Sequence, residues 1–109
     1  MHAVTKPVPF LDLSAQYKKL EAEWLDAIRA TGAKGSFILG PNVTEFEKEF
    51  ASHVGVKHAI GVANGTDSLI LSLRALNIGP GAEVITTPFT FFASSEAIDV
   101  VGAIILMVV

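Results

Sequence analysis

Two short segments of this sequence carry residue types suited to ligand chemistry, and each directly follows an apolar run. The first is Asn64-Gly65-Thr66, after the apolar run Lys57–Ala63. A helix that starts here would expose free N–H groups, and its dipole would favour an anion. Gly65 lets a ligand approach the backbone closely, and the hydroxyls of Thr66 and Ser68 add hydrogen-bonding groups. The arrangement predicts a phosphate site.

An ordinary capped turn explains the same residues. Thr66 or Asp67 would then be the N-cap of the helix, with no ligand involved. Neither the P-loop pattern nor the dinucleotide-binding glycine pattern is present, so nucleoside triphosphate and Rossmann functions lose support. Spacing leaves the phosphate site and the capped turn both open.

The second segment is Thr87–Phe92, after Glu83–Thr86, which is rich in β-branched residues. It holds Phe89, Phe91 and Phe92, and aromatic rings at the end of a strand can stack on a flat ligand. Burial statistics instead favour all three rings as part of a hydrophobic core. We take Phe89 as a core residue and keep both interpretations of the others.

These segments need a scaffold, and the pattern of apolar residues predicts one. The sequence begins with two helices. The first is capped by Ser14 and ends near Gly32 or Gly35, and the second follows the loop 37–41 and ends at Gly55. Asn42 with Glu45 could form a capping box for the second helix, or Pro41 could be its first residue. The predicted inner faces are Tyr17, Leu20, Trp24 and Ile28 in the first helix, and Val43, Phe46, Phe50 and Val54 in the second.

Strands and helices alternate after Gly55. We expect buried strands at Lys57–Ala63, Glu83–Thr86 and Ile104–Val109, with helices running to about Asn77 and from Phe91 to about Val101. This order predicts an α/β fold with a mainly parallel sheet and flanking helices. Ligands of such sheets bind at the carboxyl ends of the strands, where both polar segments stand.

Composition excludes several classes of function. The 109 residues carry a net charge of −3 and no cysteine. Neither a basic footprint for nucleic acid nor a thiolate site is therefore expected. His53 and His58 lack partners at metal-ligand spacing, so no metal site is predicted. The longest apolar run, Val100–Val109, is about half the roughly 20 residues of a membrane span, and residues 1–9 lack a signal-peptide core. We expect a cytoplasmic protein without membrane contact.

Taken together, the motifs resemble the DegT/DnrJ/EryC1/StrS family, the sugar aminotransferases of pyridoxal-phosphate (PLP) fold type I. Each motif alone is weak, whereas five in the right order and spacing are specific. The resemblance extends from about Val8 to Ala103. The motifs that carry it are Val8–Leu13, Phe37–Glu47, Ala63–Leu69, Gly79–Ile85 and Thr87–Ser94.

The resemblance implies a cofactor, a reaction and an assembly. Gly65 and Thr66 match the pair that holds the PLP phosphate, Phe91 matches the residue that stacks on the pyridine ring, and Ser94 lies in the segment lining the pocket. An amino group would pass from an amino acid, usually glutamate, to a keto-sugar nucleotide in a homodimer. Residues 1–36 would form an N-terminal arm and helix, and residues 37–109 would begin the large cofactor-binding domain, which resembles that of aspartate aminotransferase.

One departure from the family concerns the catalytic groups. The last lysine is Lys57, whereas the Schiff-base lysine and the pyridine-pairing aspartate of the family come far downstream of the phosphate turn. Ile104–Val109 is also wholly apolar, where the family has a strand closing in an aspartate. We therefore expect an incomplete large domain without catalytic residues, inactive by itself. Two alternatives stay open: a PLP-dependent sugar dehydratase of the same family, and a non-catalytic truncated or frameshifted fragment.

Overall fold

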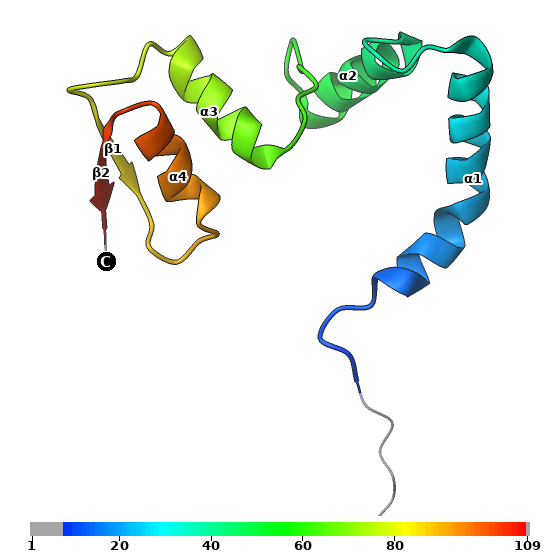
Figure 1. Ribbon diagram of the computed structural model, residues 1–109, viewed down its shortest axis with the longest axis horizontal. Coiled ribbons are helices and arrows are strands. Elements are labelled where there is room, and N and C mark those ends of the chain that lie inside the picture. Colours follow the sequence, from blue (N-terminus) through cyan, green and yellow to red (C-terminus); the bar gives the residue numbers. More distant parts are fainter. Residues whose placement is uncertain (1–7, 109) are drawn as a thin grey trace, which may run out of the picture. The chain divides into compact units, whose positions relative to one another are not determined.

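A computed structural model describes residues 8–108 of the chain. The chain separates into two compact units, Met1–Glu49 and Phe50–Val109, and each is described by itself. The elements, in chain order, are α1 (Leu13–Lys34), α2 (Pro41–Val54), α3 (Gly65–Ala75), β1 (Glu83–Thr86), α4 (Ala93–Val100) and β2 (Ile104–Met107) (Figure 1).

Helix α1 is capped by Asp12, so the prediction of Ser14 as the cap was wrong. The Asp12 carboxylate accepts hydrogen bonds from the amides of Ser14 and Ala15 at 3.1 and 3.2 Å. The Ser14 hydroxyl donates to the same oxygen over 2.6 Å, and these bonds, the Ser14 hydroxyl first, lower the pKa of the Asp12 carboxyl. The residue before the helix reaches the free amides that a residue inside the first turn cannot. The helix ends at Gly35, the second of the two predicted ends, whose φ is 63°.

The predicted apolar side of α1 is present but uncovered. The rings of Tyr17 and Trp24 meet edge to face with centroids 5.8 Å apart, and both side chains, like Ile28, remain exposed. Pro41 is the first residue of α2, which decides between the two predicted helix starts. Asn42 forms no capping box there, since its amide donates to the Thr31 hydroxyl over 2.9 Å. Local signals thus set the helix ends.

The turn between these helices requires a glycine. A Cβ at Gly40 would lie 2.6 Å from the main-chain oxygen of Ser36, closer than real contacts allow. The amide of Val43 donates to the Gly40 oxygen over 3.0 Å, which joins the turn to the first turn of α2. The predicted apolar loop therefore exists as a tight connection. At its other end α2 stops at Gly55, whose φ is 77°.

The predicted strand at Lys57–Ala63 was wrong, because the structure assigns no strand to these residues. A strand exists only through its ladder of hydrogen bonds to a neighbour. In the described chain β1 and β2 pair with each other alone, and Ile60 is 82% exposed. The apolar composition of this segment was read correctly. Composition cannot specify a pairing partner, however, and no such partner is present within residues 8–108.

The second unit has a strand–helix–strand arrangement at its centre. Strands β1 and β2 pair in parallel, with Glu83 opposite Ile104 and Thr86 opposite Met107. Helix α4 connects the strands, and α3 packs beside α4. The α/β class and the parallel pairing predicted from the sequence are confirmed. The predicted third strand ends at Met107, and Val109 lies outside the described residues.

Two alanines and an isoleucine of α4 are buried at the centre of this unit. Ala93, Ala97 and Ile98 of α4 are 5%, 1% and 3% exposed. Alanine lets α4 lie close to its neighbours, so this helix is the most firmly packed element of the unit. No helix within residues 8–108 combines the length and the apolar character needed to cross a bilayer. The predicted division into residues 1–36 and 37–109 stays a prediction.

Candidate functional site

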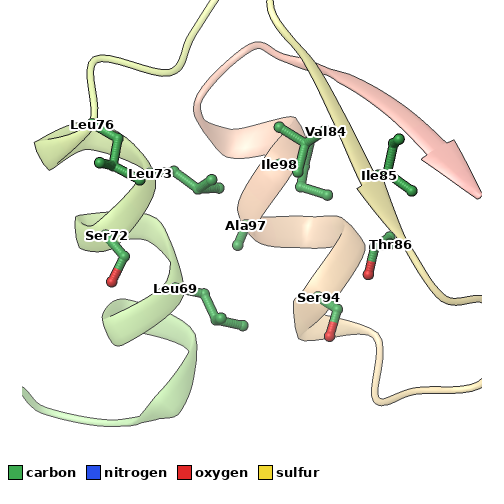
Figure 2. A pocket seen from close by; sticks show the side chains of 10 residues that line it. All are labelled: Leu69, Ser72, Leu73, Leu76, Val84, Ile85, Thr86, Ser94, Ala97 and Ile98. Carbon is green, nitrogen blue, oxygen red and sulfur yellow. The ribbon is translucent and has the colours of Figure 1, made fainter.

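The second unit brings both polar segments to one end. Figure 2 shows Leu69 near the start of α3, Ser94 at the start of α4 and Thr86 at the end of β1 grouped toward one side of the unit. Leu76 and Val84 lie toward the opposite side. The loops before α3 and after β1 therefore stand at the carboxyl edge of the strands, where ligands of open α/β sheets bind.

Asn64 is the N-cap of α3, so the predicted caps Thr66 and Asp67 were wrong. Its side-chain oxygen accepts from the Asp67 amide over 2.9 Å, and its main-chain oxygen accepts from Ser68 over 3.1 Å. Asn64 is extended, with φ −163° and ψ 176°, which lets the side chain turn back onto the first helical turn. The spacing of Asn64 and Asp67 was the sequence signal for this cap.

The cap leaves three donors open at the start of α3. The amides of Gly65 and Thr66 and the Thr66 hydroxyl have no hydrogen-bond partner within residues 8–108. A Cβ at Gly65 would meet nothing within 4 Å, so the space in front of the turn is open. The side-chain amide of Asn64 donates to the Asp67 carboxylate over 3.1 Å. Two amides, a hydroxyl and the positive end of a helix dipole suit a phosphate.

The aromatic loop is exposed, which contradicts the interpretation of its rings as core. Phe89, Phe91 and Phe92 are 97%, 78% and 70% exposed. They stand on the loop after β1, and no element of the described chain covers them. Phe91 and Phe92 line a pocket of about 340 Å³ at the carboxyl ends of both strands. Its other lining residues are Thr87, Pro88, Thr90, Ser95 and Met107.

Ser94 lies close to Phe91 in the chain but faces a different pocket. It lines a mainly apolar pocket of about 210 Å³ between α3, β1 and α4 (Figure 2). Its hydroxyl and that of Thr90 lie 2.9 Å apart and share a hydrogen bond. Gly65 and Thr66 line neither pocket. The structure thus gathers the four predicted site residues at one end of the unit without joining them in a single cavity.

Sequence reasoning missed two of the residues at this end, Asn64 as the cap of α3 and Thr90 as the partner of Ser94. Thr90 and Ser94 stand four residues apart across the loop–helix junction, a spacing that brings side chains together in a helical turn. No group of three metal-binding side chains occurs among residues 8–108. The open donors at α3 suit an anion, and the exposed rings after β1 could stack on a flat ligand.

Comparison with known proteins gives consistent matches. The profile described as the DegT/DnrJ/EryC1/StrS aminotransferase family matches residues 18–108. A dTDP-3-amino-3,4,6-trideoxy-alpha-D-glucose transaminase of Streptomyces venezuelae is 48% identical over 101 residues, which are 93% of this chain and 27% of the relative. The chain thus spans about a quarter of that relative's length.

Solved structures are similar over the same region. The crystal structure of S. venezuelae DesV in complex with a ketimine intermediate matches with a TM-score of 0.90 and 46% identity, over 95% of this chain and 28% of that one. Spr1654 from Streptococcus pneumoniae in its PLP form matches with a TM-score of 0.75 and 32% identity, over 77% of this chain and 21% of that one.

Proposed function

This chain belongs to the DegT/DnrJ/EryC1/StrS aminotransferase family, and on that premise we propose that it supplies the phosphate turn and the stacking ring of a PLP site. The reaction is the transfer of an amino group from an amino acid, glutamate in our proposal, to a keto-sugar nucleotide. The fold of the complete domain is PLP fold type I, of which residues 37–109 form the beginning. A cytoplasmic homodimer is the proposed assembly.

The open donors at the start of α3 are the observation that carries this proposal. The amides of Gly65 and Thr66 and the Thr66 hydroxyl are three open hydrogen-bond donors at the positive end of the helix. A phosphate with two negative charges is stabilised there by charge-assisted hydrogen bonds, which are about twice as strong as neutral ones. The Asn64 cap orders the turn without occupying these donors.

The aromatic loop supplies the second contact. The Phe91 ring is 78% exposed at the carboxyl edge and lines a pocket there, so one face of it is available to a flat ligand. Stacking of this ring on the pyridine would fix the plane of the cofactor while α3 holds its phosphate. Ser94 borders the same junction and is the fourth proposed cofactor-binding residue.

The residues of this chain bind and orient, and they do not transfer protons in our proposal. PLP supplies the electron sink on which transamination depends. The chain has no lysine after Lys57, so the proposal assigns no catalytic residue to it. The names of the relatives favour transamination over the dehydratase alternative.

A chimera tests the proposal. In it, this chain replaces the matching 101 residues of the S. venezuelae transaminase. We expect the chimera to bind PLP, seen by absorbance, and to transaminate the relative's own substrate. The chain alone should show no turnover with glutamate and a keto-sugar nucleotide, because it lacks a lysine after Lys57. A folded chimera that binds no PLP, or steady turnover by the purified chain, would contradict the proposal.

A further inference from the structure

Ser94 ties the loop that carries Phe91 to the start of α4 in two ways. Its amide donates to the main-chain oxygen of Phe91 over 3.1 Å. Its hydroxyl shares a hydrogen bond of 2.9 Å with the hydroxyl of Thr90. The amide bond holds the carbonyl of Phe91, and the hydroxyl bond holds Thr90, the residue before it. The backbone of Phe91 is therefore attached to α4 at both of its ends.

The backbone of Ser94 is held firmly, whereas the ring of Phe91 is not. Ser94 belongs to the helix in which Ala97 and Ile98 are 1% and 3% exposed, so its backbone is fixed by packing. The Phe91 ring is 78% exposed and makes few contacts that could orient it. The position of this ring therefore depends on how firmly residues 90 and 91 are attached to α4.

The hydroxyl pair is not a helix cap. A capping side chain accepts a hydrogen bond from a free backbone amide of the first turn. At α4 no side chain does so, because the amides of Ser94 and Ser95 donate to the main-chain oxygens of Phe91 and Phe92. The bond between Thr90 and Ser94 therefore satisfies no backbone group, and its effect is to hold Thr90 against the helix.

We propose that Thr90 is a positioning residue: through Ser94 it holds Phe91 in the orientation in which its ring stacks on the cofactor. Stacking requires a defined ring plane, and a mobile loop would have to lose that freedom when the ligand binds. The stacking partner rests on the proposed function, whereas the ordering of Phe91 by Thr90 does not.

The same loop contains a matched control. The Ser95 hydroxyl donates to the main-chain oxygen of Phe92 over 2.9 Å, which is a separate bond to the backbone of the neighbouring phenylalanine. Thr90→Val and Ser95→Ala each remove one hydroxyl bond from the junction, but from different phenylalanines. Thr90→Ser keeps the hydroxyl and changes only the methyl group.

The first measurement needs no ligand. NMR relaxation on the complete labelled chain gives the order of the backbone and Cβ of Phe91 and Phe92. We expect Thr90→Val to lower the order of Phe91 and spare Phe92, Ser95→Ala to do the reverse, and Thr90→Ser to match the parent. Equal order of Phe91 in the parent and Thr90→Val overturns the proposal. Should Thr90→Val lose its dispersed amide signals, Ser94→Ala breaks the same bond from the other side and takes its place.

The second measurement uses 4′-deoxypyridoxine 5′-phosphate, which has the ring and phosphate of the cofactor but cannot react with lysine. Loss of one hydrogen bond in Thr90→Val should weaken binding by about two- to tenfold, and Thr90→Ser should restore it. Unchanged affinity in Thr90→Val overturns the role of Thr90 in stacking. The titration is done in the chimera, in which absence of binding with the parent sequence counts against the proposed function, and the order of Phe91 then still decides what Thr90 does.

Discussion

Helices α3 and α4 both begin in loops at the carboxyl edge of the strands, yet the backbone amides of their first turns have different hydrogen-bond partners. At α3 the side chain of Asn64 takes one amide, that of Asp67, and those of Gly65 and Thr66 stay open. At α4 the main-chain oxygens of Phe91 and Phe92 accept from residues 94–96. Within residues 8–108, the first two amides of α3 are thus open, whereas the amides of residues 94–96 at α4 are taken up by the loop before that helix.

The difference assigns separate tasks to the two helix starts. Amides that donate to their own loop are not available to a phosphate, and their bonds attach that loop to the helix. The start of α4 is built in this way, and it carries the exposed Phe91 ring. At the start of α3, by contrast, backbone donors are open, and the cap is a side chain from the residue before the helix. In the proposed function, α3 holds the phosphate and the loop before α4 holds the ring.

The largest effect should come from Thr66→Ala, which removes a side-chain donor from α3. Loss of a hydrogen bond to a charged group costs about 1.5–3 kcal/mol, or about a ten- to hundredfold weaker hold on PLP. PLP titration of the chimera by absorbance measures it, with Thr66→Ser as the control that keeps the hydroxyl. If Thr66→Ala binds PLP as tightly as the parent, the turn at Asn64 is only a helix cap.

Asn64→Ala tests the comparison through the stability of the folded chain. It removes the side-chain cap that α3 needs and α4 does without, at a cost of about 0.5–2 kcal/mol. Chemical unfolding of the chain, followed by circular dichroism, measures this loss. Asn64→Asp keeps the accepting oxygen and should stay near the parent. Equal stability of Asn64→Ala and the parent would show that the cap contributes nothing.

Phe91→Ala tests the contribution of the aromatic ring on the loop before α4. Stacking beyond simple burial contributes about 0.5–1.5 kcal/mol, so PLP should bind about two- to tenfold more weakly in the chimera. Phe91→Tyr keeps an aromatic face and should retain the affinity. An effect larger than that of Thr66→Ala would reverse the proposed division of tasks between the two helix starts.

The smallest effect is expected for Phe89→Ala. Its side chain is 97% exposed and lines no pocket with Phe91. Exposed substitutions of this kind change stability by no more than about 0.5 kcal/mol. PLP titration and thermal unfolding of the chimera should both match the parent. A specific loss of PLP binding in Phe89→Ala, with Thr66→Ala unaffected, would move the site away from α3.

Much of the site was predictable because its signals are local. The sequence predicted β1 to the residue, the turn at Asn64 and the loop 87–92, since β-branched runs and glycine or proline breaks act over a few neighbours. The order of five motifs also predicted the family that the profile match confirms. The cap of α3 was misassigned although its signal, Asn64 before Asp67, is equally local.

The sequence by itself thus determined which segments are helical, though not the residues that cap α1 and α3, and it determined which runs are apolar and which family the chain belongs to. Only the tertiary structure decided that Lys57–Ala63 is not a strand, that the ring of Phe89 is exposed, and that Ser94 faces another pocket than Phe91. The physical reason is the range of the interactions. Caps and turns are satisfied within a few residues, whereas a strand needs a partner and a buried ring needs a cover from elsewhere in the fold.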